Sequence, residues 1–516
     1  MTLAPILFLL LSALITWLIR RRHNRTQWIV AGVLGFTVWA LMLVIDPDQA
    51  SVVSLSIWQP EDLFQSPISL SLDPITWPLV YGTTTVLLAV ILTADTRPTG
   101  AHAGMRSFWF LYTASAVAAI MAANLLTTAI GWTVMDLGTL FFFLTISEGP
   151  SDRRAIFIRA GVNAVSVLLV VAAAMASEIQ AISALDLTAA SASGIMLLAL
   201  AATFRLGLIP LHFALPTIAP LRRGVGTFLR LFPPVVAMAL LARVFAAGLP
   251  EIMRIIFFFA GGLAGLLAAL RWVFQEETVG ARPFFVLALS SLGLIAATIS
   301  AQGYPIIVAV GVMLLLVGAV VSLFEQHTPS HRAIPVVTSI LLLGIPFTPG
   351  GMYAAVIGDL DNFLGAPLMG IIALIISSLL ALGCFHLYFF DETDWPISES
   401  IGRVMFNLGL VLPLLAAIGV GVWRLRSEPV NALIGSTAAL LLTAGFFFGF
   451  RSLTRERIAI VRGSFQWFDP ERAYETIWKL WQRVLVLVRQ VADLLEGVSG
   501  MLWLFVFVII ILFIIQ

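Results

Sequence analysis

Apolar runs long enough to cross a lipid bilayer fill most of this chain. A transmembrane helix needs about 20 apolar residues, because each residue adds 1.5 Å to a path of about 30 Å. Sixteen such runs occur in the 516 residues, at about 3–19, 28–45, 74–93, 107–123, 125–147, 156–176, 192–216, 226–247, 252–273, 283–300, 304–324, 334–358, 367–390, 403–423, 431–450 and 500–515. Hydrophobic residues make up 60% of the chain, and charged residues only 11%. The sequence therefore predicts an all-α polytopic membrane protein of about 16 transmembrane helices.

The runs divide the chain into six segments. We expect an N-terminal three-helix segment at 1–106, five-helix blocks at 107–247 and 252–390, two further helices at 403–450, an amphipathic helix at 469–496 and a last transmembrane helix at 500–516. In the amphipathic segment, apolar residues recur at helical spacing, and Glu475, Lys479 and Arg483 fill the other face. Such a helix lies in a membrane interface or along a neighbouring protein. A plain surface linker helix is the alternative.

Two of the apolar runs contain glycine and proline in their interior. Residues 207–216 include Pro210 and Pro216, and residues 344–351 include Pro346 and Pro349. Proline removes a backbone donor and clashes with the preceding turn, so each run must break. In hydrocarbon the freed backbone groups need protein or water as partners. A broken helix in each half of a membrane protein is typical of an ion path.

Basic residues predict the orientation of the chain, since they collect on the cytoplasmic side of a membrane. With the N-terminus outside, the inner loops carry Arg20–Arg25, Arg97, Arg106, Arg153, Arg154, Arg159, Arg222, Arg223, Arg282 and Arg332, and the outer loops carry Asp46, Asp48, Glu61, Asp62, Glu178, Asp186, Glu251, Asp359 and Asp361. The main exception is the outer loop with Arg424 and Arg426. We expect both termini on the outer side of a bacterial-type cytoplasmic (inner) membrane.

Few ionisable side chains fall inside the predicted helices, and a charge in a bilayer is costly enough to indicate a function. The proton-path candidates are Asp136, Arg205, His212, Arg230 and His386. Asp136 and Arg205 are the natural pair, because a carboxylate and a guanidinium buried together hold each other charged. Each candidate also has a structural interpretation: the pair can fix helix register, His212 can bond a freed carbonyl, Arg230 and Arg243 can snorkel toward headgroups or cap loops, and His386 can be a packing residue. His386 is the only titratable side chain that we expect deep in the second half.

Redox and metal chemistry are not expected on this chain. Cys384 is the only cysteine, and the six histidines lack the spacing of a metal site. The sequence contains no nucleotide-binding loop, flavin motif or set of iron–sulfur ligands. We therefore expect no catalytic residue, no metal, no cofactor and no nucleic acid partner, and any electron transfer must belong to other proteins.

Several segments, in order along the chain, resemble the antiporter-like membrane subunits shared by respiratory complex I, Mrp antiporters and membrane-bound hydrogenases. Residues 123–135, ANLLTTAIGWTVM, resemble the D-L-L-T-x-F-x-x-W-E-L-M of the family's fifth helix, and residues 205–216, RLGLIPLHFALP, resemble the K-S-A-Q-x-P-x-H-x-W-L-P of its seventh. Further similar segments are 69–75, 240–243, 289–293 and 344–350. The resemblance, above all to the complex I subunit with a lateral helix, implies two inverted five-helix repeats with broken seventh and twelfth helices. It also implies lipids and other membrane-arm subunits as partners.

The chain departs from the row of buried charges along which the family moves protons. The position of the fifth-helix glutamate is Thr133, with Asp136 one turn further on, and the seventh-helix lysine is replaced by Arg205. The charged positions of the eighth and twelfth helices fall at Val235 and Ala354. Arginine hardly ever releases its proton, whereas a buried lysine can. We therefore expect an impaired or absent proton path and a mainly architectural role.

Three functions remain open. The resemblance favours a proton-translocation-module subunit of a complex I-type complex, such as a NADH:quinone oxidoreductase. The second is a membrane subunit of an inorganic-carbon uptake or Mrp-type cation/proton antiporter assembly. The third, an autonomous transporter of an organic solute, is disfavoured, because a solute site needs several convergent polar groups and the predicted helices hold few.

Overall fold

The computed structural model describes residues 2–48, 52–55, 67–94, 104–147, 150–177, 186–188, 190–211, 223–274, 278–300, 303–325, 329–390 and 400–452, together with Arg483 and Val486. The chain forms two compact units, Met1–Ser452 and Leu453–Gln516. The predicted amphipathic helix at 469–496 and the last predicted span belong to the second unit. They lie outside the described residues, except for Arg483 and Val486, which are both helical.

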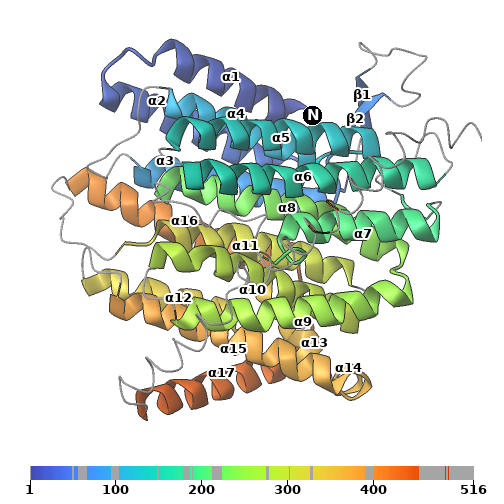
Figure 1. The fold of residues 1–516 in the computed structure, drawn as a ribbon. Coiled ribbons are helices and arrows are strands. Elements are labelled where there is room, and N and C mark those ends of the chain that lie inside the picture. Colours follow the sequence, from blue (N-terminus) through green and yellow to red (C-terminus); the bar gives the residue numbers. More distant parts are fainter. Residues whose placement is uncertain are drawn as a thin grey trace, which may run out of the picture. The chain divides into compact units, whose positions relative to one another are not determined.

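Helices make up most of the first unit and follow the apolar runs in order (Figure 1). They are α1 (Ala4–Leu18), α2 (Asn24–Val44), α3 (Thr76–Ala94), α4 (Met105–Ile120), α5 (Leu125–Ile146), α6 (Pro150–Ala176), α7 (Ala192–Leu206), α8 (Arg223–Ala247), α9 (Glu251–Phe274), α10 (Thr278–Ile299), α11 (Tyr304–Leu323), the 3₁₀-helix η1 (Pro329–Arg332), α12 (Ala333–Leu342), α13 (Gly350–Gly358), α14 (Leu360–Gly365), α15 (Pro367–Phe390), α16 (Ser400–Trp423) and α17 (Pro429–Ser452). Within the described part of the chain, 11 helices are long and apolar enough to cross a membrane, and α1, α7 and α12 are shorter apolar helices.

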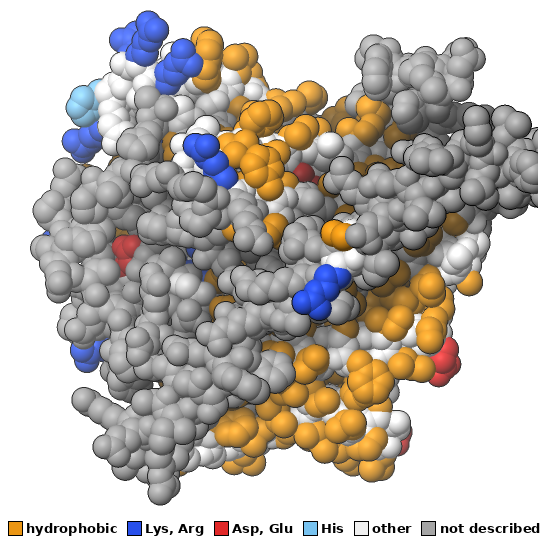
Figure 2. Space-filling model, in the orientation of Figure 1, with side chains coloured by type: hydrophobic (Ala, Val, Ile, Leu, Met, Phe, Trp, Pro, Cys, Tyr) orange, Lys and Arg blue, Asp and Glu red, His pale blue; other side chains and the backbone are white. Residues whose placement is uncertain are grey.

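The centre of the first unit is built from four helices. Helices α3, α8 and α11 are buried along the whole of an 18-residue stretch, and α10 nearly so. Helix α11 packs against the other three and against α16. The outer faces of α1, α5, α6, α9 and α17 expose large apolar side chains instead. Figure 2 shows such hydrophobic side chains over much of the described part of one face. A soluble protein rarely exposes so many, whereas lipid tails cover them at no cost.

Both glycine–proline segments interrupt the helices. Helix α7 ends one residue before Gly207, which adopts the left-handed conformation with φ of 75°. Helix α12 ends two residues before Gly344, which has φ of 79°, and α13 begins only at Gly350. A left-handed residue stops a helix, and glycine adopts this conformation without a steric penalty. Pro210, Pro346 and Pro349 lie outside the helices, and Pro216 lies outside the described residues.

An antiparallel hairpin, which the sequence did not predict, precedes α3. Strand β1 (Val52–Leu55) pairs with β2 (Ile68–Ser71), with the first residue of β1 opposite Ser71. Strand β2 also binds the connection between α4 and α5, because the backbone N–H of Ser71 donates to the carbonyl of Met121 at 2.7 Å. Strand β2, Ile-Ser-Leu-Ser, does alternate apolar and polar residues, but β1 does not, and four residues is the shortest run in which alternation indicates a strand.

Arg424, the exception in the predicted charge pattern, is neutralised by two carboxylates. Its Nη1 lies 2.9 Å from an oxygen of Asp48, and its Nη2 lies 3.4 Å from an oxygen of Asp46. Both acids belong to the loop after α2, so Arg424 and this loop lie at the same end of the helices. The sequence also places both loops on one side, the outer side. A basic residue whose charge is balanced locally does not conflict with that orientation.

Replacing Arg424 with glutamine is expected to lower the free energy of unfolding by less than about 1 kcal/mol, because a solvent-exposed ion pair contributes little. The side chains of Asp46 and Asp48 are 50% and 62% exposed. Unfolding in mixed micelles by a denaturing detergent, followed by circular dichroism, measures the change. The control is Arg426→Gln, since Arg426 donates to the carbonyl of Val422 in the preceding helix α16. A loss above about 2 kcal/mol would show that the pair stabilises the fold by far more than an exposed ion pair does.

Candidate functional site

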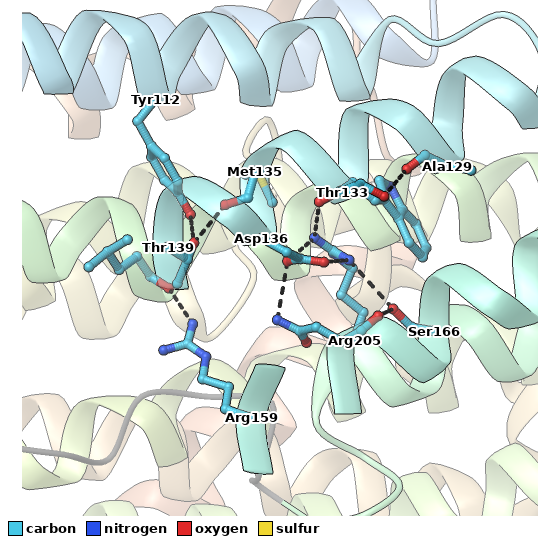
Figure 3. Close-up of polar contacts among 12 residues, drawn as sticks. Tyr112, Ala129, Thr133, Met135, Asp136, Thr139, Arg159, Ser166 and Arg205 are labelled. Carbon is cyan, nitrogen blue, oxygen red and sulfur yellow. Dashed lines mark hydrogen bonds and ion pairs between the residues drawn. The ribbon is translucent and has the colours of Figure 1, made fainter. Parts of the chain in front are cut away.

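The centre of the candidate site is an ion pair between helices α5 and α7 (Figure 3). The Nη2 of Arg205 lies 2.7 Å from Oδ1 of Asp136, and its Nη1 lies 3.1 Å from Oδ2. Two guanidinium nitrogens thus face two carboxylate oxygens, the geometry that makes arginine–carboxylate pairs strong. The side chain of Arg205 is fully buried, and that of Asp136 is 17% exposed. The two residues that the sequence suggests as a natural pair therefore touch.

Side chains from α5 and α6 hold this ion pair in place. The amide of Asn163 donates to Oδ1 of Asp136 at 3.2 Å. Arg205 donates to the hydroxyl of Ser166 at 3.5 Å and to the carbonyl of Trp132 at 3.4 Å. Its guanidinium also lies 4.5 Å from the centre of the Trp132 ring, and an aromatic face attracts a cation. The pair is therefore surrounded by groups that match its charges.

The local sequence explains how each partner reaches the site. Asn124 caps α5, because its side chain accepts a backbone N–H of the first turn at 2.7 Å. Trp132 and Asp136 follow on this helix, four residues apart and therefore on one face. Arg205 lies in the last turn of α7, where the helix dipole favours a positive charge, and Gly207 ends the helix directly after it. The start of α5 and the end of α7 thus set the level at which the pair meets.

A second arginine, Arg159, lies beside the pair, although the sequence suggested an aqueous loop for it. It belongs to α6 and is 5% exposed. Its Nη2 donates to the carbonyl of Leu229 in α8 at 3.3 Å, and its guanidinium lies 4.9 Å from the centre of the Phe143 ring. The loop prediction was wrong because α6 begins at Pro150, six residues before the predicted run 156–176, so Arg159 lies more than two turns inside the helix and not at its aqueous end. Burial beneath neighbouring helices leaves no trace in the sequence around Arg159.

Hydroxyl groups extend the polar region from Asp136 along α5 (Figure 3). The hydroxyl groups of Tyr112 and Thr139 lie 2.8 Å apart, and the hydroxyl of Thr139 also lies 2.9 Å from the carbonyl of Met135. The positive charge of Arg159 interacts electrostatically with the hydroxyl group of Tyr112. Polar groups therefore continue for about one helical turn beyond the ion pair, toward the end of α5.

The two arginines of α8 are buried and do not snorkel to headgroups, so that part of the expectation was wrong, whereas Arg243 does contact a loop residue, Asp73. Arg230 is 2% exposed, and the charge of Arg159 acts on it. Toward the other end of α8, Arg243 is also buried, and its Nη2 lies 2.9 Å from Oδ2 of Asp73. Helices α3, α7 and α11 pack around α8 and bury both side chains. We refer to Arg159, Arg205, Arg230 and Asp136 as the arginine cluster.

The second half of the unit buries ionisable groups that the sequence did not single out. Arg282, Glu325 and His331 are all buried, and Nε2 of His331 lies 2.6 Å from the amide oxygen of Asn407. They lie near the ends of helices, and a prediction from apolar runs alone places charged residues at such positions in loops. His386, the candidate from the sequence, belongs to α15, but its side chain is not among those described. His212 lies in the undescribed segment after α7.

The fold and the site define a polytopic integral membrane protein with ion pairs buried between its helices. No known family matches the sequence, and no curated protein does. A chain of the Mrp complex from Dietzia sp. DQ12-45-1b is similar in structure, with a TM-score of 0.72 and 16% identity over 98% of this chain and 62% of that chain. A chain of the membrane-bound sulfane sulfur reductase (MBS), an archaeal respiratory membrane complex, is similar with a TM-score of 0.71 and 15% identity over 99% of both chains. The present chain thus spans less than two thirds of the Mrp chain, and what it shares with both is the fold.

Proposed function

We propose that this chain is an antiporter-like membrane subunit of a complex I-type energy-converting complex and that its own proton path is impaired. One similar structure is a chain of an Mrp complex, and another is a chain of an archaeal respiratory membrane complex. The main observation in support of an impaired path is the ion pair between Asp136 and Arg205. The family that the sequence resembles has a lysine at this position, whereas this chain has Arg205. Arg205 makes two contacts with the carboxylate of Asp136.

A proton relay needs groups that release a proton and take it up again. Arginine, with a pKa above about 12, does not do so in proteins. Both oxygens of Asp136 already accept hydrogen bonds from Arg205. Val235 and Ala354, at two further charged positions of the family, are buried apolar side chains. The ion pair therefore serves to join α5 to α7 and to hold a fixed charge pattern between them.

The test replaces the pair by apolar side chains of similar size, Asp136→Leu together with Arg205→Met, within the assembled complex. We expect proton pumping into vesicles to fall by less than about tenfold, because no proton passes through the pair. Arg205→Gln is measured beside it, and Arg153→Gln, an exposed arginine of α6, is the control. A native gel checks assembly. A tenfold or larger loss in the double variant and in Arg205→Gln, with the complex fully assembled, would overturn the architectural role.

A second candidate is a membrane subunit of an inorganic-carbon uptake or Mrp-type cation/proton antiporter assembly. It is supported by the likeness to a chain of an Mrp complex over 98% of this chain. The partners that copurify from gently solubilised membranes separate the two candidates. A quinone reductase or hydrogenase supports the first, and a zinc hydratase-like protein supports carbon uptake. Two inverted repeats, a lateral helix at 469–496 and outward-facing termini in a bacterial-type inner membrane remain part of both proposals.

A further inference from the structure

The arginine cluster carries more positive charge than the described residues around it balance. Asp136 pairs with Arg205 and its charge acts on Arg159, whereas the charge that acts on Arg230 is the positive charge of Arg159. Among these four buried groups, three positive charges and one negative charge leave +2. Both oxygens of Asp136 already accept hydrogen bonds, from Arg205 and from the amide of Asn163. The carboxylate therefore has little left to offer to the other two arginines.

Two of the guanidinium groups have nitrogen atoms without a hydrogen-bond partner among the described residues. These atoms are Nε and Nη1 of Arg159 and Nε and Nη1 of Arg230. Both side chains are at least nine-tenths buried, so bulk water does not reach them. The Nη2 of Arg159 bonds the carbonyl of Leu229, the residue directly before Arg230. Arg159 thus reaches the backbone directly before Arg230, and the two positive charges repel each other.

The usual ways of neutralising a buried arginine do not apply to this pair. Arginine does not give up its proton in proteins. Snorkelling would leave the guanidinium exposed, which neither Arg159 nor Arg230 is. The ring of Phe143 beside Arg159 attracts a cation but carries no net charge. A buried charge without a counter-charge is strongly destabilising, and among the described residues no carboxylate is left to balance these two groups, so a bound anion would stabilise them.

We propose that Arg159 and Arg230 form a binding site for an oxyanion, of the class of phosphate, hydrogencarbonate or the phosphate of an acidic lipid. A guanidinium presents N–H groups in a planar fork that matches two oxygens of one oxyanion. A spherical anion such as chloride cannot use this fork in the same way. The proposal rests on burial and charge alone and does not depend on the proposed function.

The site lies toward one end of the helices. Arg159 follows the start of α6 by nine residues, and Arg230 follows the start of α8 by seven. At 1.5 Å per residue these are distances of about 13 Å and about 10 Å. Both starts lie at the same end, because Arg159 contacts α8 at Leu229. Both groups thus lie nearer to this end of their helices than to the opposite end, and a free oxyanion or a lipid phosphate would have to approach from it.

Binding measurements on the full chain in detergent distinguish the two sources. For a free oxyanion, sodium phosphate or sodium hydrogencarbonate raises the Tm of the wild type saturably at constant ionic strength, and sodium chloride does not. For a lipid phosphate, native mass spectrometry shows an acidic lipid retained by the wild type. In both cases Arg159→Gln and Arg230→Gln are expected to weaken binding at least about tenfold. The control is Arg153→Gln, an exposed arginine of the same helix α6, which is expected to change binding by less than about twofold.

The proposal can be tested even if some variants do not fold. If the glutamine variants do not fold, Arg159→Lys keeps the charge, loses the fork and is expected to weaken binding about tenfold. In buffers and lipids without oxyanions, Arg159→Gln is expected to have a Tm at least as high as the wild type, because it removes an unbalanced charge. The proposal is overturned if neither oxyanions nor acidic lipids bind the wild type, or if Arg153→Gln weakens binding as much as Arg159→Gln. Since binding is measured, and not pumping, this result is separate from the test of the proposed function.

Discussion

Asp136→Asn is expected to lower the free energy of unfolding by about 3–5 kcal/mol, because it leaves the buried guanidinium of Arg205 without its counter-charge. Arg205 is fully buried, and the positive charge of Arg159 acts on it as well. Arginine cannot escape by losing its proton. Asparagine keeps the size of the side chain and one carbonyl oxygen, so the loss reports the missing charge and not a cavity.

The opposite single variant is expected to be milder. Arg205→Gln leaves a carboxyl group that is 17% exposed and keeps its hydrogen bond from Asn163. A carboxyl group can take up a proton and become neutral, so we expect a loss of about 1–3 kcal/mol. The double variant Asp136→Leu with Arg205→Met is expected to be close to the wild type, since apolar side chains often replace a buried pair without loss.

Detergent-induced unfolding in mixed micelles, followed by circular dichroism, ranks the three variants. Asp186→Asn is the control, because Asp186 is exposed and its contacts, with the hydroxyl and the backbone N–H of Thr188, are local. Equal losses in Asp136→Asn and Asp186→Asn would show that the charge of Arg205 is balanced in another way. A double variant as unstable as Asp136→Asn would show that the pair contributes shape and hydrogen bonds more than charge.

Most of the helices could be predicted because a bilayer leaves an apolar run of about 20 residues few alternatives to a helix. The contact between Asp136 and Arg205 could be suggested for a related reason. They were among the few ionisable groups inside the runs of the first half, and they have opposite charges. Both predictions rest on the high free energy of exposed backbone groups and of charges in lipid. Because of that cost, helices and buried charges can be recognised in a single sequence.

The burial of Arg159 and Arg230 could not be predicted in the same way. Each lies near the end of an apolar run, where a snorkelling side chain and a buried one have the same sequence around them. What decides between the two is the packing of α6 against α5 and α7, and of α8 against α3, α4, α7 and α11. Packing depends on which helices become neighbours, and a single sequence does not show this. The hairpin of β1 and β2 was missed because its strands are short.

The ion pair of Asp73 and Arg243 was missed because 170 residues separate its partners. It joins the start of α3 to the C-terminal part of α8. Oδ2 of Asp73 lies 2.9 Å from Nη2 of Arg243, while Oδ1 accepts the backbone N–H groups of Ile75 and Thr76 at 3.0 and 2.9 Å. One carboxylate thus caps a helix and neutralises a buried arginine at the same time.

Asp73→Asn is expected to lower the free energy of unfolding by about 3 kcal/mol, the lower end of the range for breaking a buried pair. The asparagine oxygen can still cap α3, so the loss comes chiefly from the uncompensated charge of Arg243. The matched control is Asp48→Asn, which removes the same charge from the exposed pair with Arg424 and is expected to cost less than about 1 kcal/mol. Both are measured by the same unfolding in mixed micelles.

A double-mutant cycle separates the pair from the cap. If charge is the cause, Asp73→Asn combined with Arg243→Gln should recover most of the loss, because no buried charge then lacks a partner. If the two single losses simply add, Asp73 acts through the cap alone, and the buried pair contributes nothing to joining α3 and α8. The exposed pair of Asp48 and Arg424 should show little coupling in the same cycle, since solvent screens its charges before and after either change. Burial, and not the mere presence of opposite charges, is then what makes an ion pair hold these helices together.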